Sequence, residues 1–480
     1  MQRLKNHLLI IIFLISYFAV TAYKFIAYPT PFYDWDESIY AQVGKEMVQQ
    51  KSIVPLWQGQ YWLDKPPLVP LAYGIVESIV PLKPELSTRL FTLSLTIILF
   101  IFIYYFYYKL TKNGFISFLT VVISSFTSIF LQRAQVLNVD TFLFLGWMGY
   151  LVFYEHFWLS FLFLAIGVLS KSLLGFYPVI LIFGLHFYQL FTKSISFSKF
   201  IHKSRNLVIQ SSILLLWYVG MFLYFKYPFI QAHFLDSMAK RVTASIESHF
   251  GKRTFYIDLL FDELKVFAYL SISGTVLIVI NFFRKRDIKN TLFLLFFIPW
   301  FLFLNLTKTK INWYLYPVIP QFAFLGVYIL SYIKNKKIFL ALISLFITGV
   351  IIFKNFSTNS FFGAHYSSYD ENYELAIYAK EHCKELNVLV DKDSRTTHDT
   401  LQKMNLLIGT SEWWGNHPAI VYYSNIHVNF IYNIDEFSRT LNTSLVKTCF
   451  IVNESDKNVM TEKFLLQRIR YEKNLYLYIK

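Results

Sequence analysis

Long apolar segments alternate with short polar segments over the first 355 residues of the chain. A helix needs roughly 20 apolar residues to cross a bilayer, so this pattern predicts about eleven membrane-spanning helices. The apolar stretch Leu68–Leu82 contains Pro70 and Pro81 and predicts a re-entrant or interfacial helix instead. The predicted spans are Leu8–Ala27, Leu86–Tyr108, Phe115–Leu131, Val139–Tyr154, Phe157–Leu169, Leu173–Phe191, Leu207–Phe225, Leu264–Phe283, Leu292–Leu306, Trp313–Ile333 and Ile338–Phe353.

The composition becomes polar after about Asn355, where a small α/β domain is predicted for residues 356–480. The predicted elements are a helix near Glu371–Glu385 and strands near Asn387–Val390, Ala419–Tyr423, Val428–Tyr432, Thr448–Val452 and Leu475–Ile479. Both cysteines, Cys383 and Cys449, lie in this part, but two cysteines carry no spacing signature, so their pairing stays open. We expect a polytopic α-helical membrane protein (residues 1–355) with a small extracytoplasmic α/β domain.

The composition excludes an ordinary soluble protein. The chain is 55% hydrophobic and only 16% charged, whereas soluble domains average about 25% charged residues. The net charge of +15 arises from basic loops on one side of the predicted bundle, such as 109–112, 193–205 and 284–289. The positive-inside rule places these loops and the N-terminus in the cytoplasm, and the C-terminal domain outside. The charge therefore indicates no nucleic-acid partner. The low cysteine content favours the bacterial inner membrane over the endoplasmic reticulum.

The first outer loop, residues 28–85, contains two groups of charged side chains. Asp36 and Glu37 stand at the start of a predicted helix, where acidic residues also act as ordinary helix caps. Lys65 precedes two prolines, which hold its backbone extended. Asp64 is adjacent and offers an ion-pair partner.

The helix that follows Asp36 is predicted to be amphipathic. Its apolar face, Ile39, Val43 and Met47, is expected to lie in the membrane interface. Asp34 and Asp36 also spell Asp-x-Asp, a pair that can hold a divalent metal on a diphosphate. Because this loop lies outside and its neighbours are basic, we expect no metal.

Other outward residues run against the charge bias that membrane topology produces. They are Arg133, Lys171, Arg253, Lys308 and Lys310, with His249 in the second outer loop. Cations at these helix ends indicate an anionic partner, although any one of them could contact lipid phosphates. A carboxylate can deprotonate an acceptor hydroxyl, and cations can stabilise a departing phosphate. Together they suit sugar transfer from a lipid phosphate.

The ordered set of motifs resembles the protein O-mannosyltransferase-like (family 39/83) glycosyltransferases, which include bacterial aminoarabinose transferases. The matching stretches are Asp36-Glu37, Tyr40-Ala41, Glu46-Met47, Pro55, Gly59, Lys65-Pro66-Pro67, Arg89-Leu90, Ser170–Gly175, Asp236–Tyr256 and Thr309–Pro317. The resemblance covers about residues 30–325. It implies a GT-C fold and inverting transfer from a polyprenyl-phosphate sugar, with no essential metal or other cofactor. The expected acceptor is a hydroxyl or phosphate of a lipid, glycan or protein at the periplasmic face.

Carried over position by position, the resemblance implies that Asp36 is the catalytic carboxylate, supported by Glu37, Tyr40 and Asp64. The candidates for binding the donor phosphate are Lys65, Arg253, Lys310, Lys308, Arg133 and Lys171, with His249 assigned to the acceptor or the loop. The chain departs from the pattern at Ile39, where aminoarabinose transferases carry arginine, and at Ser172, Leu173 and Asn312, which replace glycine, proline and proline. Specificity for aminoarabinose or lipid A is therefore not carried over.

Two other classes share some of these features. A transporter or flippase of a lipid-linked sugar would need many helices and a basic groove, but also polar groups at mid-depth and broken helices in paired halves. The predicted spans hold few ionisable residues at mid-depth. A receptor or assembly subunit could bind sugars through Trp413-Trp414, because exposed tryptophans stack on sugars. Such a pair equally suits a protein core.

Overall fold

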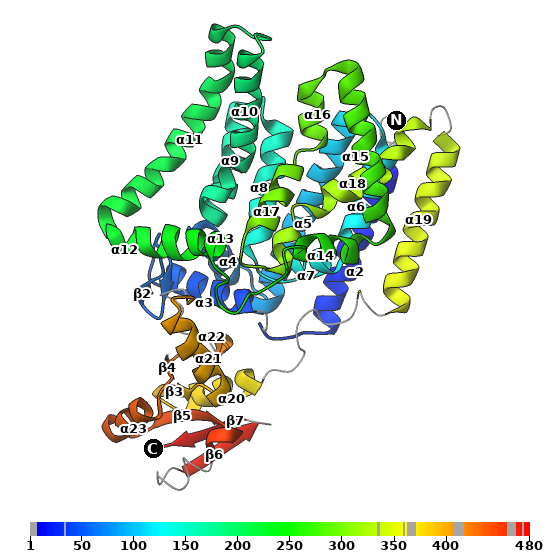
Figure 1. The fold of residues 1–480 in the computed structure, drawn as a ribbon. Helices are drawn as coiled ribbons and strands as arrows, with labels where there is room; N and C mark the ends of the chain where they lie inside the picture. Colours follow the sequence, from blue (N-terminus) through cyan, green and yellow to red (C-terminus); the bar gives the residue numbers. More distant parts are fainter. Residues whose placement is uncertain are drawn as a thin grey trace.

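The computed structural model describes residues 7–32, 35–333, 337–358, 361, 371–407, 417–457, 467–472 and 475–480. They form a large helical bundle with a small sheet at one end (Figure 1). The helix α2 (Leu8–Ala27) begins at the end of the bundle opposite to the sheet. The turn that joins α10 (Tyr177–Phe191) to α11 (Phe197–Phe225) also lies at that opposite end.

Six helical segments among the described residues are long and apolar enough to cross a membrane. They are α2, α5 (Pro84–Thr111), the stretch Phe157–Phe191, α11, α15 (Val266–Lys285) and α19 (Lys337–Ser357). The helices α16 (Ile288–Leu294) and α17 (Ile298–Leu306) meet at 55° and make a seventh candidate. Shorter apolar helices are α4 (Leu68–Ile79), α6 (Gly114–Ser125), α8 (Val139–Phe153) and α18 (Ile319–Val327).

The expected number of about eleven spans is therefore not confirmed. Helices of 12 and 15 residues, such as α6 and α8, rise only about 18 and 22 Å at 1.5 Å per residue. The segment predicted over Phe115–Leu131 also breaks before α7 (Ser128–Arg133), where Thr127 caps a new helix. Apolar length alone overestimates how much of each segment is one helix.

The C-terminal sheet has five strands in the order β4-β3-β5-β7-β6. The strands are β3 (Glu385–Leu389), β4 (His427–Ile431), β5 (Thr448–Asn453), β6 (Gln467–Glu472) and β7 (Leu475–Ile479). β3 pairs in parallel with β4 and β5, whereas β7 pairs antiparallel with β5 and β6. The helices of this part are α20 (Glu371–His382), α21 (Lys392–Lys403), α22 (Ala419–Ser424) and α23 (Ile434–Thr443).

One predicted strand is wrong: the stretch Ala419–Tyr423 forms helix α22. All six residues of α22 are buried. A short, continuously apolar run has no visible period, so it fits a buried strand and a buried helix equally well.

The two cysteines are joined. Cys383 precedes β3 and Cys449 lies in β5, the neighbouring strand, and their Cα atoms are 5.7 Å apart. The disulfide closes a loop across a sequence separation of 66 residues. It links the helix α20 to the centre of the sheet.

The helix α3 (Trp35–Gln49) packs across α4. Gly44 and Gly74 mark the point of closest approach, because a Cβ at either position would overlap the backbone of the other helix. The predicted apolar face of α3 is buried in this contact and not in the membrane interface, which corrects the expectation for Ile39, Val43 and Met47. Protein, not lipid, covers the face.

This packing makes a testable prediction. We expect Gly74→Ala to lower the thermal unfolding midpoint by several degrees, since overpacking a tight contact typically costs about 1–3 kcal/mol. The control is Gly220→Ala in α11, where an added Cβ meets nothing within 4 Å. Fluorescence-detected thermal unfolding in detergent compares the two. Equal midpoints for both variants would contradict the close approach of α3 and α4.

Candidate active site

Glu37 and Arg89 form a buried ion pair that fixes the start of α3 against α5. The guanidinium donates from Nε and Nη2 to the two carboxylate oxygens of Glu37, both at 2.9 Å. It also donates to the carbonyl oxygens of Thr30 and Pro31, both at 2.8 Å. The backbone N–H of Leu137 donates to Glu37 at 3.3 Å. Both carboxylate oxygens of Glu37 are therefore occupied by hydrogen bonds that hold the first outer loop in place.

Asp36 points the other way and keeps 27% of its side chain exposed. Its Oδ2 lies 3.7 Å from Nη1 of Arg133, which is fully buried and stacks 4.5 Å from the centre of the Trp313 ring. Tyr40 lies one turn further along α3. Burial, followed by the charge of Asp36, raises the pKa of Tyr40 well above its usual value. Its hydroxyl stays protonated beside the Asp36 carboxylate.

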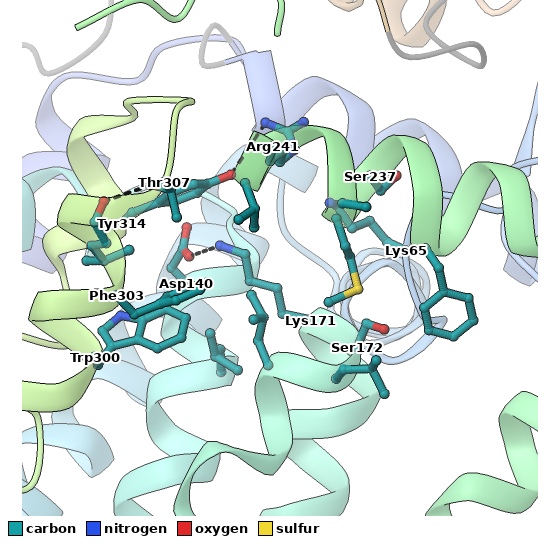
Figure 2. A pocket seen from close by; sticks show the side chains of 18 of the residues that line it. Lys65, Asp140, Lys171, Ser172, Ser237, Arg241, Trp300, Phe303, Thr307 and Tyr314 are labelled. Atoms are coloured by element: carbon teal, nitrogen blue, oxygen red, sulfur yellow. Dashed lines mark hydrogen bonds and ion pairs between the residues drawn. The ribbon is translucent and has the colours of Figure 1, made fainter. Parts of the chain in front are cut away.

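A cavity of about 350 Å³ lies between the first outer loop, the second outer loop and the ends of α8, α9 (Phe157–Lys171) and α17. Its polar lining residues are Asp64, Lys65, Asp140, Lys171, Ser172, Ser237, Arg241, Thr307 and Tyr314. The rest of the lining is apolar, and includes Leu173 and Phe303, which are 40% and 36% exposed. The cavity therefore combines charged side chains with apolar ones, such as Trp300 and Phe303 (Figure 2), and two of the apolar ones are exposed.

Two of the cations in the cavity are held by neighbouring side chains. Lys171, the last residue of α9, donates to Oδ1 of Asp140 at 2.5 Å and lies 4.5 Å from the centre of the Tyr314 ring. Arg241 donates to the hydroxyl of Tyr314 at 3.4 Å and pairs with Glu247 at 3.6 Å. The interaction of Lys171 with Asp140 and that of Arg241 with Tyr314 are drawn in Figure 2. The Oδ2 atom of Asp140 has no hydrogen-bond partner among the described residues.

Lys65 is half-buried between the first outer loop and the cavity. Burial, followed by repulsion from Arg241 and Lys171, lowers the pKa of Lys65 to about 8, although the charges of Asp64 and Asp36 act in the opposite direction. For Arg241, burial opposes the charged form, but Tyr314, Glu247, Asp36 and Asp64 raise its pKa overall. Asp36 does not line the cavity, yet its charge acts on both of these cations. The cavity lining holds three cations, Lys65, Lys171 and Arg241, and two carboxylates, Asp64 and Asp140.

The second outer loop closes over the cavity through a π-helix, η2 (Ile230–Ala239), followed by α13 (Lys240–Thr243). π-Helical turns are rare and occur frequently at functional sites. His233 of η2 is buried, with Nδ1 3.0 Å from the carbonyl oxygen of Leu63 and Nε2 2.8 Å from Oγ of Ser172. Burial lowers the pKa of His233 to about 4, so it is neutral. A carbonyl only accepts, so Nδ1–H donates to Leu63 and Nε2 accepts from Ser172.

Ser172 is the position where the chain departs from the family's glycine. Its backbone has φ 60° and ψ −142°, a conformation that favours glycine. A serine keeps this shape here because its hydroxyl is bonded to His233, and it gains a further contact from Tyr218 at 3.4 Å. The substitution therefore links the end of α9 to the second outer loop.

Besides Asp36, Glu37, Tyr40 and Arg133, four predicted residues lie outside the cavity lining. Lys310 is buried and donates to the carbonyl oxygens of Leu304 and Asn305, both at 3.2 Å, at the end of α17. Lys308 and Arg253 are exposed. The backbone of His249 accepts from Lys310 N–H at 3.1 Å.

The stretch around Thr309 instead supports the second outer loop. The N–H groups of Lys308 and Thr309 donate to the carbonyl oxygens of Val242 and Arg241, both at 3.1 Å. The Thr309 hydroxyl donates to Ala244 at 2.7 Å. This motif positions Arg241 rather than contributing a cation of its own.

Of the residues predicted to act, Asp64, Lys65 and Lys171 line the cavity, while Asp36, Tyr40 and Arg133 cluster beside it. The prediction assigned no role to Asp140, Arg241 or Tyr314. Arg241 is one of several cations in the outer loops, and the sequence does not indicate which of them line the cavity.

Two expectations fall outside the described residues, because Asp34 and Trp413-Trp414 are not among them. No group of three or more His, Cys, Asp or Glu side chains that could hold a metal ion occurs among the described residues.

No protein-family model matches the sequence, and no curated protein matches it. Solved structures do match the fold. ArnT from Cupriavidus metallidurans bound to undecaprenyl phosphate is 11% identical with a TM-score of 0.67, and the match covers 98% of this chain and 97% of that one. The apo oligosaccharyltransferase of Archaeoglobus fulgidus is 10% identical with a TM-score of 0.58, covering 93% and 70%. The resemblance to GT-C glycosyltransferases is thus confirmed at the level of the fold.

The Glu37–Arg89 pair predicts a large and non-additive effect on stability. Removing one member of a buried pair leaves an uncompensated charge and typically costs about 3–5 kcal/mol. We expect Glu37→Gln or Arg89→Met to lower the unfolding midpoint strongly, and the double variant to lose less than the sum. Asp262→Asn, in an exposed ion pair with Lys265, should change little. Additive losses in thermal unfolding would show that the two side chains are not coupled.

Proposed function

We propose that this protein is a membrane glycosyltransferase that moves a sugar from a polyprenyl-phosphate donor to an acceptor hydroxyl, with inversion, at the periplasmic face of the bacterial inner membrane. One observation carries the proposal: Lys65, Lys171 and Arg241 line a cavity that is also lined by many apolar side chains, two of which, Leu173 and Phe303, are exposed. A ligand that fits both kinds of lining has an anionic head and a hydrocarbon tail.

A lipid phosphate has this chemistry. The exposed apolar residues Leu173 and Phe303 give a tail lateral access from the bilayer, while the three cations neutralise the phosphate. The shared fold with an ArnT solved with undecaprenyl phosphate supports a polyprenyl lipid. The basic loops at the far end of the bundle support a periplasmic site by the positive-inside rule.

In the proposed reaction the acceptor hydroxyl attacks the anomeric carbon of the bound sugar. Its proton passes to Asp36, which keeps part of its surface exposed beside Arg133. The bond between the anomeric carbon and the phosphate oxygen breaks with its electron pair on the oxygen. Polyprenyl phosphate leaves as an anion, stabilised by Lys65, Lys171 and Arg241. The ion pair with Arg133 holds Asp36 in place.

The donor class is tested by native mass spectrometry of lipids that co-purify with the protein. We compare wild type, Asp36→Asn, and a variant in which Lys65, Lys171 and Arg241 are all replaced by Gln. A polyprenyl-phosphate sugar should be retained by Asp36→Asn and lost from the triple variant. If both variants retain the polyprenyl-phosphate sugar equally, the cavity is not the donor site.

Replacing the base gives the second prediction. Asp36→Asn keeps the shape but cannot accept a proton, so sugar transfer in proteoliposomes should fall by about 10²–10⁴-fold. Donor binding should persist. Asp262→Asn, an exposed carboxylate change elsewhere, serves as the matched control. Transfer by Asp36→Asn at the wild-type rate would exclude the proposed role of Asp36.

The lowered pKa of Lys65 gives a third prediction from the proposed function. Lys65 loses its charge as the pH rises through about 8. Affinity for undecaprenyl phosphate should therefore be about tenfold weaker at pH 9 than at pH 7, because binding must then also protonate the amine. In Lys65→Arg the side chain stays charged and this decline should vanish. Thermophoresis in detergent measures both, and identical pH profiles would contradict the assignment.

A further inference from the structure

A second cavity, of about 830 Å³, lies between the outer loops and the C-terminal sheet. Gln58 and Gln60 line it from the hairpin of β1 (Leu56–Trp57) and β2 (Gln60–Tyr61), and Asp236 and Lys240 from the second outer loop. The strands β3 and β4 and the helix α21 form the opposite wall. We call this cavity the polar cleft.

The polar cleft is lined mainly by groups that both donate and accept hydrogen bonds. Asn and Gln supply seven of its lining residues. The charges of Asp236 and Lys240 neutralise each other in an ion pair of 2.7 Å. A lining of paired amides with little net charge suits a neutral ligand rich in hydroxyls, because each hydroxyl also donates and accepts.

One buried amide in the polar cleft is left without a partner. Asn387 of β3 is fully buried, and its Oδ1 accepts from Asn429 at 3.1 Å. Its Nδ2 has no hydrogen-bond partner among the described residues. Asn429 also donates to Glu385 at 2.8 Å, and its Oδ1 lies 3.0 Å from the ring of His427. Buried donors are normally satisfied, so Nδ2 points to a ligand oxygen.

The walls of the polar cleft are tied together by specific hydrogen bonds. The Gln58 amide pairs with both backbone groups of Val428 on the edge strand β4, at 3.0 and 2.8 Å. Glu46 of α3 accepts from the N–H groups of Gln58 and Gly59, both at 2.8 Å. Because Gln58 occupies these edge groups, a peptide cannot add to β4 there as a further strand.

The polar cleft and the first cavity share one wall. Ser237 and Arg241 face the first cavity, while Asp236 and Lys240 face the cleft from the same helical stretch. Sugar transfer at Asp36 takes place outside the cleft. Glu46 lies beneath the hairpin and is ten residues from Asp36 along α3, which corresponds to about 15 Å. A ligand that reaches both must be extended.

We propose that the polar cleft binds the distal part of an oligosaccharide acceptor, whose terminal hydroxyl reaches Asp36. This rests on the proposed function and specifies its acceptor as a glycan of several sugar units. Asn387, Asn429 and Gln402 hydrogen-bond the sugar hydroxyls, and the hairpin at Gln58 orients the chain. The sugar-binding surface thus includes the outer loops as well as the C-terminal domain.

The full-length protein in nanodiscs is screened on an array of bacterial cell-surface oligosaccharides, and the strongest ligand is titrated by calorimetry. We expect Asn429→Leu to weaken binding at least tenfold. Gln402 and Glu436 are exposed residues that also line the cleft, and Gln402→Ala combined with Glu436→Ala should weaken binding to the same extent. The control is Asn442→Leu, at an exposed position of α23 outside the cleft. It should bind as wild type does.

No oligosaccharide binding by wild type, or unchanged binding by both cleft variants, overturns the proposal. Competition by an unglycosylated peptide that displaces the oligosaccharide also overturns it. Binding of undecaprenyl phosphate is measured on the same samples. Oligosaccharide binding without lipid binding refutes the donor site and leaves the polar cleft standing, whereas lipid binding alone refutes only the cleft.

Discussion

The ion pair between Glu37 and Arg89 determines where the first outer loop meets the bundle. It joins the first turn of α3 to α5, and the same guanidinium gathers the chain at Thr30 and Pro31. Asp36 precedes Glu37, so fixing one carboxylate aims the other toward Arg133 and the cavity. A buried pair of this kind is costly to desolvate and is stable only with full hydrogen bonding, which the carbonyl oxygens supply.

The outer part of the protein behaves as one packed unit. Tyr422 and Tyr423 of α22 donate to Glu77 and Glu85, both at 2.7 Å, and the backbone N–H of Phe32 donates to Tyr423 at 2.6 Å. One hydrophobic core contains residues of α3, α4, α20, α22 and the sheet. The boundary predicted at residue 355 marks a change in composition, but residues on both sides share this core. The polar cleft exists because the two parts are held together.

The sequence identified several residues that the structure brings together, but not how they are arranged. Asp36 and Lys65 could be singled out from the sequence. A carboxylate at the start of a helix and a lysine before two prolines suit few roles in an outer loop. Lys310 could be singled out as well, yet its ammonium is bound by carbonyl oxygens at the end of α17. Arg241, in α13 directly after η2, lines the cavity. Which of these cations faces the cavity depends on contacts between distant segments. The same holds for α22, whose short apolar run fits a strand or a helix until its packing is known.

The central claim is that a lipid phosphate is bound by Lys65, Lys171 and Arg241 beside Asp36. An electron cryomicroscopy structure of the protein with undecaprenyl phosphate tests it directly. The account predicts phosphate density within hydrogen-bonding distance of these three cations, with Lys171 turned from Asp140 toward the phosphate and the tail leaving past Leu173 and Phe303. A lipid phosphate bound elsewhere, with the cavity empty and the Asp140–Lys171 pair intact, would contradict it.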